Sequence, residues 1–239
     1  MTQYLFQSFT ALFVRPFRLR EFAQQLYFVG NQSLPIILFC VTFAAVVTIL
    51  ESSFHMKMVI QNDSLVPGFA AMLILRELGA VVTALLLTSR VGAGYASEVG
   101  TMQITEQVDA LRMLGINPFQ YILIPRLFAC IVAGVILTIF ANITCLFAAM
   151  LVSEAYLGFP TSLFLSSMRR FVEFQDFYFA MIKGACFGAI IPLVACYFGF
   201  KCQQGAEGVG RATTKAVVAA SILIIGTDFL LSYLFSFFY

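Results

Sequence analysis

The first long apolar run of the chain reads PIILFCVTFAAVVTILESS, from Pro35 to Ser53, and its only charged residue is Glu51. A bilayer hydrocarbon core of about 30 Å needs about 20 apolar residues in one helix, so this run is long enough to cross it. In lipid the backbone must satisfy its own hydrogen bonds, which a helix does and an open strand does not. The run therefore predicts a transmembrane helix.

Four further runs of similar character follow along the chain, at about 66–87 with small residues continuing toward 100, and at about 119–152, 177–200 and 216–239. The composition agrees, because 61% of the 239 residues are hydrophobic and 11% are charged, against about 45–50% and about 25% in soluble domains. An ordinary soluble enzyme is excluded, and 27 Phe with 9 Tyr exclude a disordered protein. We expect an all-α integral membrane protein with five transmembrane helices and no soluble domain.

Residues 1–30 precede these runs and lack the order of features that defines a signal peptide. Their apolar residues recur at helical spacing, which predicts one or two helices lying in the membrane interface, with a flexible tail as the alternative. The residues concerned are Leu5, Phe9, Leu12 and Phe13, then Leu19, Phe22, Leu26 and Tyr27. We therefore expect a single domain over 1–239, made of an interfacial region at 1–30 and a five-helix membrane region at 31–239.

The distribution of Lys and Arg predicts the orientation, because cytoplasmic loops carry the excess of these residues. With five spans, one side of the membrane holds most of them: Arg15, Arg18, Arg20, Arg90, Arg112, Arg126, Lys201, Arg211 and Lys215. The other side holds only Lys57, Arg169 and Arg170. We expect a cytoplasmic N-terminus and a periplasmic C-terminus. The formal charge of +2 is too small to favour a nucleic-acid partner.

The loop between the second and third runs reads TMQITEQVDALRMLGINP, from Thr101 to Pro118, and predicts a short cytoplasmic helix. Thr105 can cap its N-terminus, Glu106 and Asp109 suit the positive end of the helix dipole, and Gly115 ends it. Its apolar side carries Ile104, Val108 and Leu111. Such a helix either lies on the membrane or docks into a groove of a cytosolic partner.

The last cytoplasmic loop reads KCQQGAEGVGRATTK, from Lys201 to Lys215. Its glycines lack the GK[ST] sequence and the preceding strand of a phosphate-binding loop, so a tight turn before the fifth helix is expected. If ATP drives this protein, another chain binds it. The single histidine, His55, and the absence of a CxxC pair also leave no metal-binding or catalytic constellation in the sequence.

Four ionisable residues fall inside the predicted spans: Arg76, Glu77, Lys183 and Asp228. Each costs at least about 2.5 kcal/mol at a lipid-facing midplane, so they are expected to be paired or to face a cavity. Arg76 and Glu77 are neighbours that point about 100° apart on a helix, so their partners should come from Lys183 and Asp228. The set carries no net formal charge, which suits a structural clamp and a polar site for substrate equally well.

Short motifs at fixed spacing occur in two stretches of the chain. RELG, GTM and EQ.DAL..LGI.P lie between Arg76 and Ala129, and GAEGVG begins at Gly205. Together they resemble the permease subunit of the MlaE-type ABC transporters, which belong to the MCE-associated lipid transport systems. The sequence departs from the family pattern at Ala80, Ser89 and Lys215, where proline, glycine and arginine are usual.

The resemblance implies a non-enzymatic permease of the bacterial inner membrane that pairs with a second copy of itself. It implies two cytosolic ATPase subunits that hold ATP and Mg, a periplasmic MCE-domain protein, no cofactor or metal in this chain, and phospholipid or a similar lipid as substrate. It places Arg76 and Glu77 close to the lipid cavity. It also makes residues 106–115 the coupling helix that contacts the ATPase, with the key positions Glu106, Gln107, Asp109, Leu111, Arg112 and Gly115.

Two other functions remain open at this point. One is an ion-coupled carrier in which Glu77 or Asp228 binds a proton, and the other is a membrane scaffold that transports nothing. Copurification of an ATPase subunit would distinguish the ABC permease from both the carrier and the scaffold. In the outer loop, Pro160, Leu163, Phe164, Met168 and Phe171 predict a short amphipathic helix that either helps to seat the MCE protein or anchors the loop in the interface.

Overall fold

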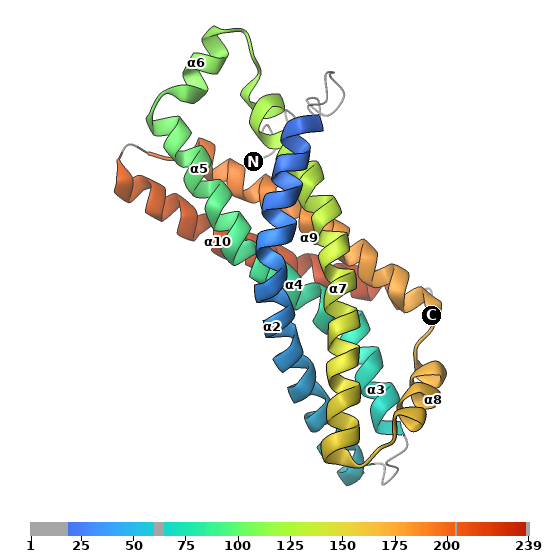
Figure 1. The fold of residues 1–239 in the computed structure, drawn as a ribbon. Coiled ribbons are helices and arrows are strands. Elements are labelled where there is room, and N and C mark those ends of the chain that lie inside the picture. Colours follow the sequence, from blue (N-terminus) through green and yellow to red (C-terminus); the bar gives the residue numbers. More distant parts are fainter. Residues whose placement is uncertain (1–18, 60–64, 204, 238–239) are drawn as a thin grey trace. The chain divides into compact units, whose positions relative to one another are not determined.

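The computed structural model describes residues 19–59, 65–203 and 205–237, and all regular structure in these ranges is helical (Figure 1). The protein is an all-α membrane protein, as expected. The α-helices are α2 (Leu19–Val59), α3 (Val66–Leu73), α4 (Gly79–Leu87), α5 (Ala93–Ile104), α6 (Gln107–Met113), α7 (Ile124–Leu157), α8 (Thr161–Phe171), α9 (Phe174–Phe200) and α10 (Ala206–Phe235). Three five-residue π-helical turns join some of them: η2 (Ile74–Leu78), η3 (Thr88–Gly92) and η4 (Phe119–Leu123).

Five helical segments are long and apolar enough to cross a membrane, which confirms the predicted number of spans. They cover Leu19–Met56, Val66–Ile104, Phe119–Leu157, Phe174–Phe200 and Ala206–Phe235. The first differs most from its predicted bounds, because residues 19–30 belong to the same continuous helix, α2, as the apolar run at 35–53. Residues 1–18, which carry the rest of the predicted interfacial region, lie outside the described residues.

The fifth span begins earlier than the sequence predicted. Most of the stretch expected to form a loop before Ala216 is helical, since α10 starts at Ala206. The turn is confined to the residues just before it, where Gly205 has a φ of +94°. Helix α10 presents its buried face, Ala212, Ala216, Ala220 and Ile224, toward a packing partner, and it packs against α5. Small residues on this face allow a close helix contact that offsets the low helix propensity of Gly208 and Gly210.

The helices group into two compact units, which are described separately. Within the described residues, one unit comprises 19–33, 84–134 and 185–237 and is called the coupling unit here. The other comprises residues 34–83 and 135–184 and is called the charge unit. The boundaries fall inside α2, α4, α7 and α9.

In the coupling unit, backbone of α9 approaches backbone of α7 at Gly188. A Cβ at Gly188 would overlap the carbonyl oxygen of Cys130, so only glycine fits there. Near the α6 end of the unit, an apolar core joins α5, α6, η4 and α9 through Val99, Val108, Ile122, Leu123 and Cys196.

In the charge unit, α8 packs against α3 (Figure 1). The backbone N–H of Gly68 donates to the hydroxyl of Ser167 at 3.0 Å, and Phe164 is 1% exposed. The amphipathic helix expected in the outer loop is therefore present, and its buried side faces α3. Helix α4 approaches α7 closely at Gly79, where a Cβ would overlap the side-chain oxygen of Asn142.

Candidate functional site

The charge unit contains a cluster of four ionisable side chains, called the charge cluster here: Arg76, Glu77, Asp176 and Lys183. Arg76 and Glu77 lie in the π-helical turn η2, and the other two lie on α9. The Lys183 ammonium donates to Glu77 Oε2 at 2.8 Å and to the carbonyl oxygen of Arg76 at 3.0 Å. The Arg76 Nε donates to Asp176 Oδ1 at 2.6 Å. The structure thus joins the second and fourth spans through two ion pairs.

The two sides of the charge cluster differ in exposure. The side chains of Asp176 and Lys183 are fully buried, whereas those of Arg76 and Glu77 are 26% and 44% exposed. The Lys183 ammonium also lies over the ring of Phe179, 4.8 Å from its centroid, which further stabilises a buried cation. The buried charges on α9 therefore hold in place a guanidinium and a carboxylate that remain reachable from outside.

A π-helical turn is a common feature of functional sites because it widens the helix and redirects the side chains it carries. The sequence indicated that the two neighbouring charges of RELG could not pair with each other and that Lys183 was a candidate partner. It did not single out Asp176, which lies in the first turn of α9 and just before the predicted span. Its position about two turns before Lys183 on the same helix was the signal available in the sequence.

Asp228, the fourth residue of the predicted set, lies on α10 in the coupling unit and is half-buried. Its grouping with Arg76, Glu77 and Lys183 remains a prediction.

An apolar groove of about 450 Å³ lies between the last turns of α2 and the start of the second span, within the charge unit. Its walls are Val47, Thr48, Ser52, Met56, Phe69 and Leu73. Glu51 and His55 also line it, and their side chains are 65% and 69% exposed and 3.4 Å apart. Leu73 directly precedes η2, so the groove and the charge cluster share one helical segment. The volume falls in the usual range for small-ligand sites.

Helix α6 forms the centre of the predicted coupling helix. Val108 is fully buried, and Leu111 packs against the same apolar core. The opposite side is exposed, and it ends in Met113 and Leu114, which are 90% and 74% exposed. Gln107 is exposed as well. An anchored helix with exposed large apolar residues at its end has the form of a docking element.

The sequence predicted the C-terminal end of α6 correctly but not its N-terminal end. Gly115, with a φ of +74°, donates to the Arg112 carbonyl at 3.0 Å, and Ile116 donates to the Leu111 carbonyl at 3.0 Å. This pair of bonds is a Schellman motif, so the predicted glycine stop is confirmed. The predicted Thr105 cap is wrong. The Thr105 hydroxyl instead donates back to the Thr101 carbonyl at the end of α5, and Glu106, with a φ of +58°, occupies the N-cap position.

Asp109 and Arg112 form an ion pair of 2.8 Å on the exposed surface of α6. Both side chains are more than half exposed, so the pair adds little to stability. Both charges therefore remain available to a partner.

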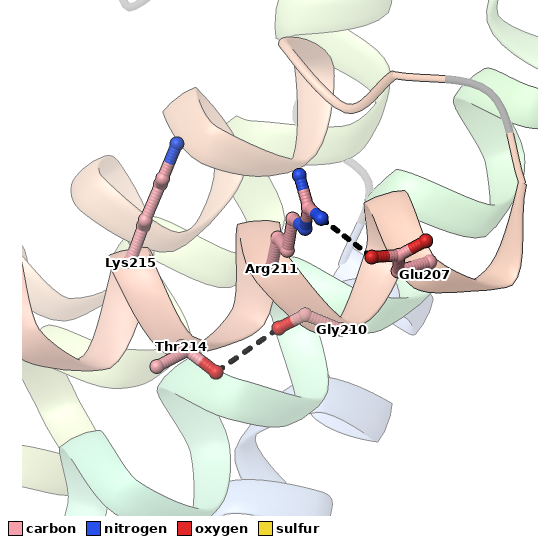
Figure 2. A pocket seen from close by; sticks show the side chains of 5 residues that line it. All are labelled: Glu207, Gly210, Arg211, Thr214 and Lys215. Carbon is pink, nitrogen blue, oxygen red and sulfur yellow. Dashed lines mark hydrogen bonds and ion pairs between the residues drawn. The ribbon is translucent and has the colours of Figure 1, made fainter.

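A second, shallow pocket lies on the first turns of α10 and is lined by Glu207, Gly210, Arg211, Thr214 and Lys215 (Figure 2). The Arg211 guanidinium donates to Glu207 one turn earlier, and the Thr214 hydroxyl donates to the Gly210 carbonyl. All five residues come from one face of α10 and are exposed. The pocket has the character of a solvated helix surface.

Comparison with known families gives one decisive match. The profile of the family described as Permease MlaE matches residues 22–234, which is almost the whole chain. The chain belongs to the MlaE permease family. The matched range includes the charge cluster, the apolar groove and α6.

Individual relatives agree with this MlaE assignment. A probable ABC transporter permease protein of Rickettsia felis is 35% identical over 96% of this chain and 88% of its own length. One from Synechocystis is 32% identical over 90% of this chain and 81% of its own. The chloroplastic protein TRIGALACTOSYLDIACYLGLYCEROL 1 of Arabidopsis thaliana is 36% identical over 90% of this chain and 61% of its own. This MlaE permease is therefore a multi-pass membrane protein of the ABC transporter permease type.

Proposed function

We propose that this permease moves phospholipid or a similar hydrophobic lipid between the bacterial inner membrane and a periplasmic MCE-domain shuttle, driven by ATP hydrolysis in a separate chain. The observation that carries the proposal is the apolar groove ending next to η2 on the same helical segment as Arg76 and Glu77. Such an arrangement suits a lipid, because acyl chains need apolar walls and the headgroup needs a few polar contacts. The name of the Arabidopsis relative, that of a galactosylated diacylglycerol, supports a glycerolipid.

In this proposal the charge cluster contacts the headgroup. The partly exposed Arg76 guanidinium supplies donors for a lipid phosphate, and Glu77 supplies an acceptor. Asp176 and Lys183 are buried and keep these two groups oriented. A cluster that only clamps helices would not need two members exposed.

Helix α6 then serves as the coupling helix. Met113 and Leu114 insert into a groove of the ATPase, and the Asp109–Arg112 pair sets the register through charge complementarity. Each permease binds one of two ATPase subunits, which hold ATP and Mg. Two permeases form a homodimer, and the apolar outer face of α10 supports this, since large side chains such as Ile222 and Phe229 are 65% and 68% exposed on it.

Helix α8 is the proposed binding site of the MCE-domain protein. Its buried side is held by α3, while Arg169 and Arg170 are exposed in its last turn. Site-specific crosslinking from Arg169 tests this role, and capture of the MCE protein is expected. Capture of lipid alone would instead show that α8 is only an interfacial anchor.

Reconstitution tests the function itself. The complex purified through this chain is expected to retain an ATPase subunit in stoichiometric amount and to transfer fluorescent phospholipid between liposomes and the MCE protein only with ATP. Transport without any ATPase would support the ion-coupled carrier, and absence of transport with any lipid would support a scaffold.

Neutralising the charge cluster separates headgroup recognition from structural clamping. The set Arg76→Met, Glu77→Gln, Asp176→Asn and Lys183→Met leaves no unpaired buried charge, so it should assemble with a thermal stability close to that of the unchanged protein. If the cluster contacts lipid, this stable complex fails to move it. Full transport by the neutralised complex would contradict the proposed role.

A further inference from the structure

The coupling unit contains a buried arginine that the proposed transport path does not use. Arg126, at the start of α7, has a side chain only 6% exposed, and its Nη2 donates to Glu98 Oε1 on α5 at 2.8 Å. The guanidinium lies over the ring of Tyr95, 5.0 Å from its centroid. Its Nε and Nη1 are buried with no hydrogen-bond partner within the described part of the chain. The residue is thus a buried cation with one of its three nitrogens paired.

Such a pair is a poor device for stability. Replacing a buried ion pair with packed apolar residues is often neutral or stabilising, because two charges must be taken out of water to form it. Here the carboxylate of Glu98 is 55% exposed, and two of the three guanidinium nitrogens are buried without a hydrogen-bond partner in the described residues. The main effect of the pair is therefore to fix the position of α5 relative to α7.

The two helices joined by the pair flank α6 in the chain. Glu98 lies on α5, the helix that enters α6, and Arg126 lies on α7, which follows α6 through η4. Between them Val108 inserts from α6 into the apolar core formed by Val99, Ile122, Leu123 and Cys196. The pair and the buried valine connect the helices on both sides of α6 to α6 itself.

The junction between α5 and α6 carries backbone strain. Glu106 has a φ of +58°, and a left-handed conformation costs a residue with a side chain about 1–2 kcal/mol. Such a conformation persists only where the surrounding structure enforces it. The Glu98–Arg126 pair and the buried Val108 are long-range contacts on the two sides of this junction.

We propose that Glu98 and Arg126 are positioning residues that fix the coupling helix relative to α5 and α7, so that a displacement of α6 moves both spans together. Its consequence for transport rests on the proposed function. The pair acts through helix geometry and touches neither lipid nor ATPase.

Hydrogen exchange on the full chain in nanodiscs tests the positioning directly and needs no partner. The double variant Glu98→Gln with Arg126→Met leaves no unpaired charge, and its thermal stability should stay close to that of the unchanged protein. Amide exchange over residues 105–117 should become about tenfold faster, as expected for the loss of one charge-assisted hydrogen bond. Exchange over α8 should not change. Arg126→Lys, which keeps the charge, should restore slow exchange.

A matched control removes an exposed ion pair on another helix, α10. Glu207→Gln with Arg211→Met deletes the exposed pair on α10 (Figure 2) and should leave exchange over 105–117 unchanged. Unchanged exchange in a stable Glu98→Gln, Arg126→Met protein would overturn the inference.

Transport per ATP hydrolysed tests the consequence. In the reconstituted complex the double variant should keep its ATPase subunit and hydrolyse ATP, while lipid moved per ATP falls by about tenfold. If the pair were only structural, the double variant would assemble less well and be less stable, but the amount of lipid moved per ATP would not change. If the unchanged chain retains no ATPase, the proposed function fails, and the exchange result alone decides whether the pair positions α6.

Discussion

Lys183 shows how a single residue can decide whether a membrane helix tolerates charge. Its ammonium is fully buried and bonds Glu77, the Arg76 carbonyl and the Phe179 ring. Lys183→Met removes the ammonium that forms an ion pair with Glu77. We expect a loss of about 1–3 kcal/mol in the free energy of unfolding, because the Arg76 carbonyl loses its donor and the partly exposed Glu77 carboxylate loses its cation.

Reversible unfolding in micelles measures this loss. Lys183→Met with Glu77→Gln should recover part of it, whereas strictly additive losses would show that the two residues do not interact. Lys201→Met is the matched control, since Lys201 is exposed and donates to the Tyr197 hydroxyl one turn away. It should change stability by less than about 0.5 kcal/mol.

At the scale of the helix, α9 depends on Gly188 for its approach to α7. Gly188→Ala places a Cβ against the Cys130 carbonyl and the Ile131 Cα, both backbone atoms that cannot rotate away. The two helices must separate, and we expect a loss of about 1–3 kcal/mol with a lower melting temperature. Gly94→Ala on α5, where a Cβ meets nothing within 4 Å, is the control and should be neutral or slightly stabilising. Equal stability of both variants would show that the helix contact is looser than described.

Helix α6 allows a sharper test of docking than simple charge removal. Exchanging the two charges, Asp109→Arg with Arg112→Asp, retains an i,i+3 ion pair within the helix and reverses the pattern presented to a partner. We expect insertion and thermal stability to be kept while copurified ATPase falls by about tenfold or more, because like charges then meet across the interface. Retention of the ATPase together with unchanged transport would remove this pair from the contact.

For the whole molecule, labelling of Cys202 can test the predicted orientation in the membrane. It lies between the fourth and fifth spans, outside both, and is partly exposed, whereas Cys40 and Cys186 lie within spans. If this loop is cytoplasmic, a membrane-impermeant thiol reagent should label inverted vesicles and not intact spheroplasts. Burial raises the pKa of the Cys202 thiol, so less thiolate is present near neutral pH and the labelling rate should rise as the pH increases. Cys202→Ser should abolish the signal, and labelling from the outside would reverse the assigned topology.

Hydropathy and local motifs determined much of this protein without any structure. The five spans follow from runs such as 35–53, because lipid leaves a long apolar segment no alternative to a helix. The stop of α6 at Gly115 follows from local backbone freedom, and the family follows from RELG and GAEGVG. These features depend on residues close in sequence, which is why they could be predicted.

Only the tertiary structure decided which distant side chains meet. Asp176 pairs with Arg76 across 100 residues, and Arg126 pairs with Glu98, although the sequence placed Arg126 only among the cytoplasmic cations and did not single out Glu98. The start of α10 at Ala206 and the left-handed Glu106 likewise depend on packing, since neither glycine-rich sequence nor a glutamate favours the observed backbone. Partners at long range are set by how helices rotate and approach one another, and that rotation is fixed by contacts such as Gly188 against Cys130, which no local pattern encodes.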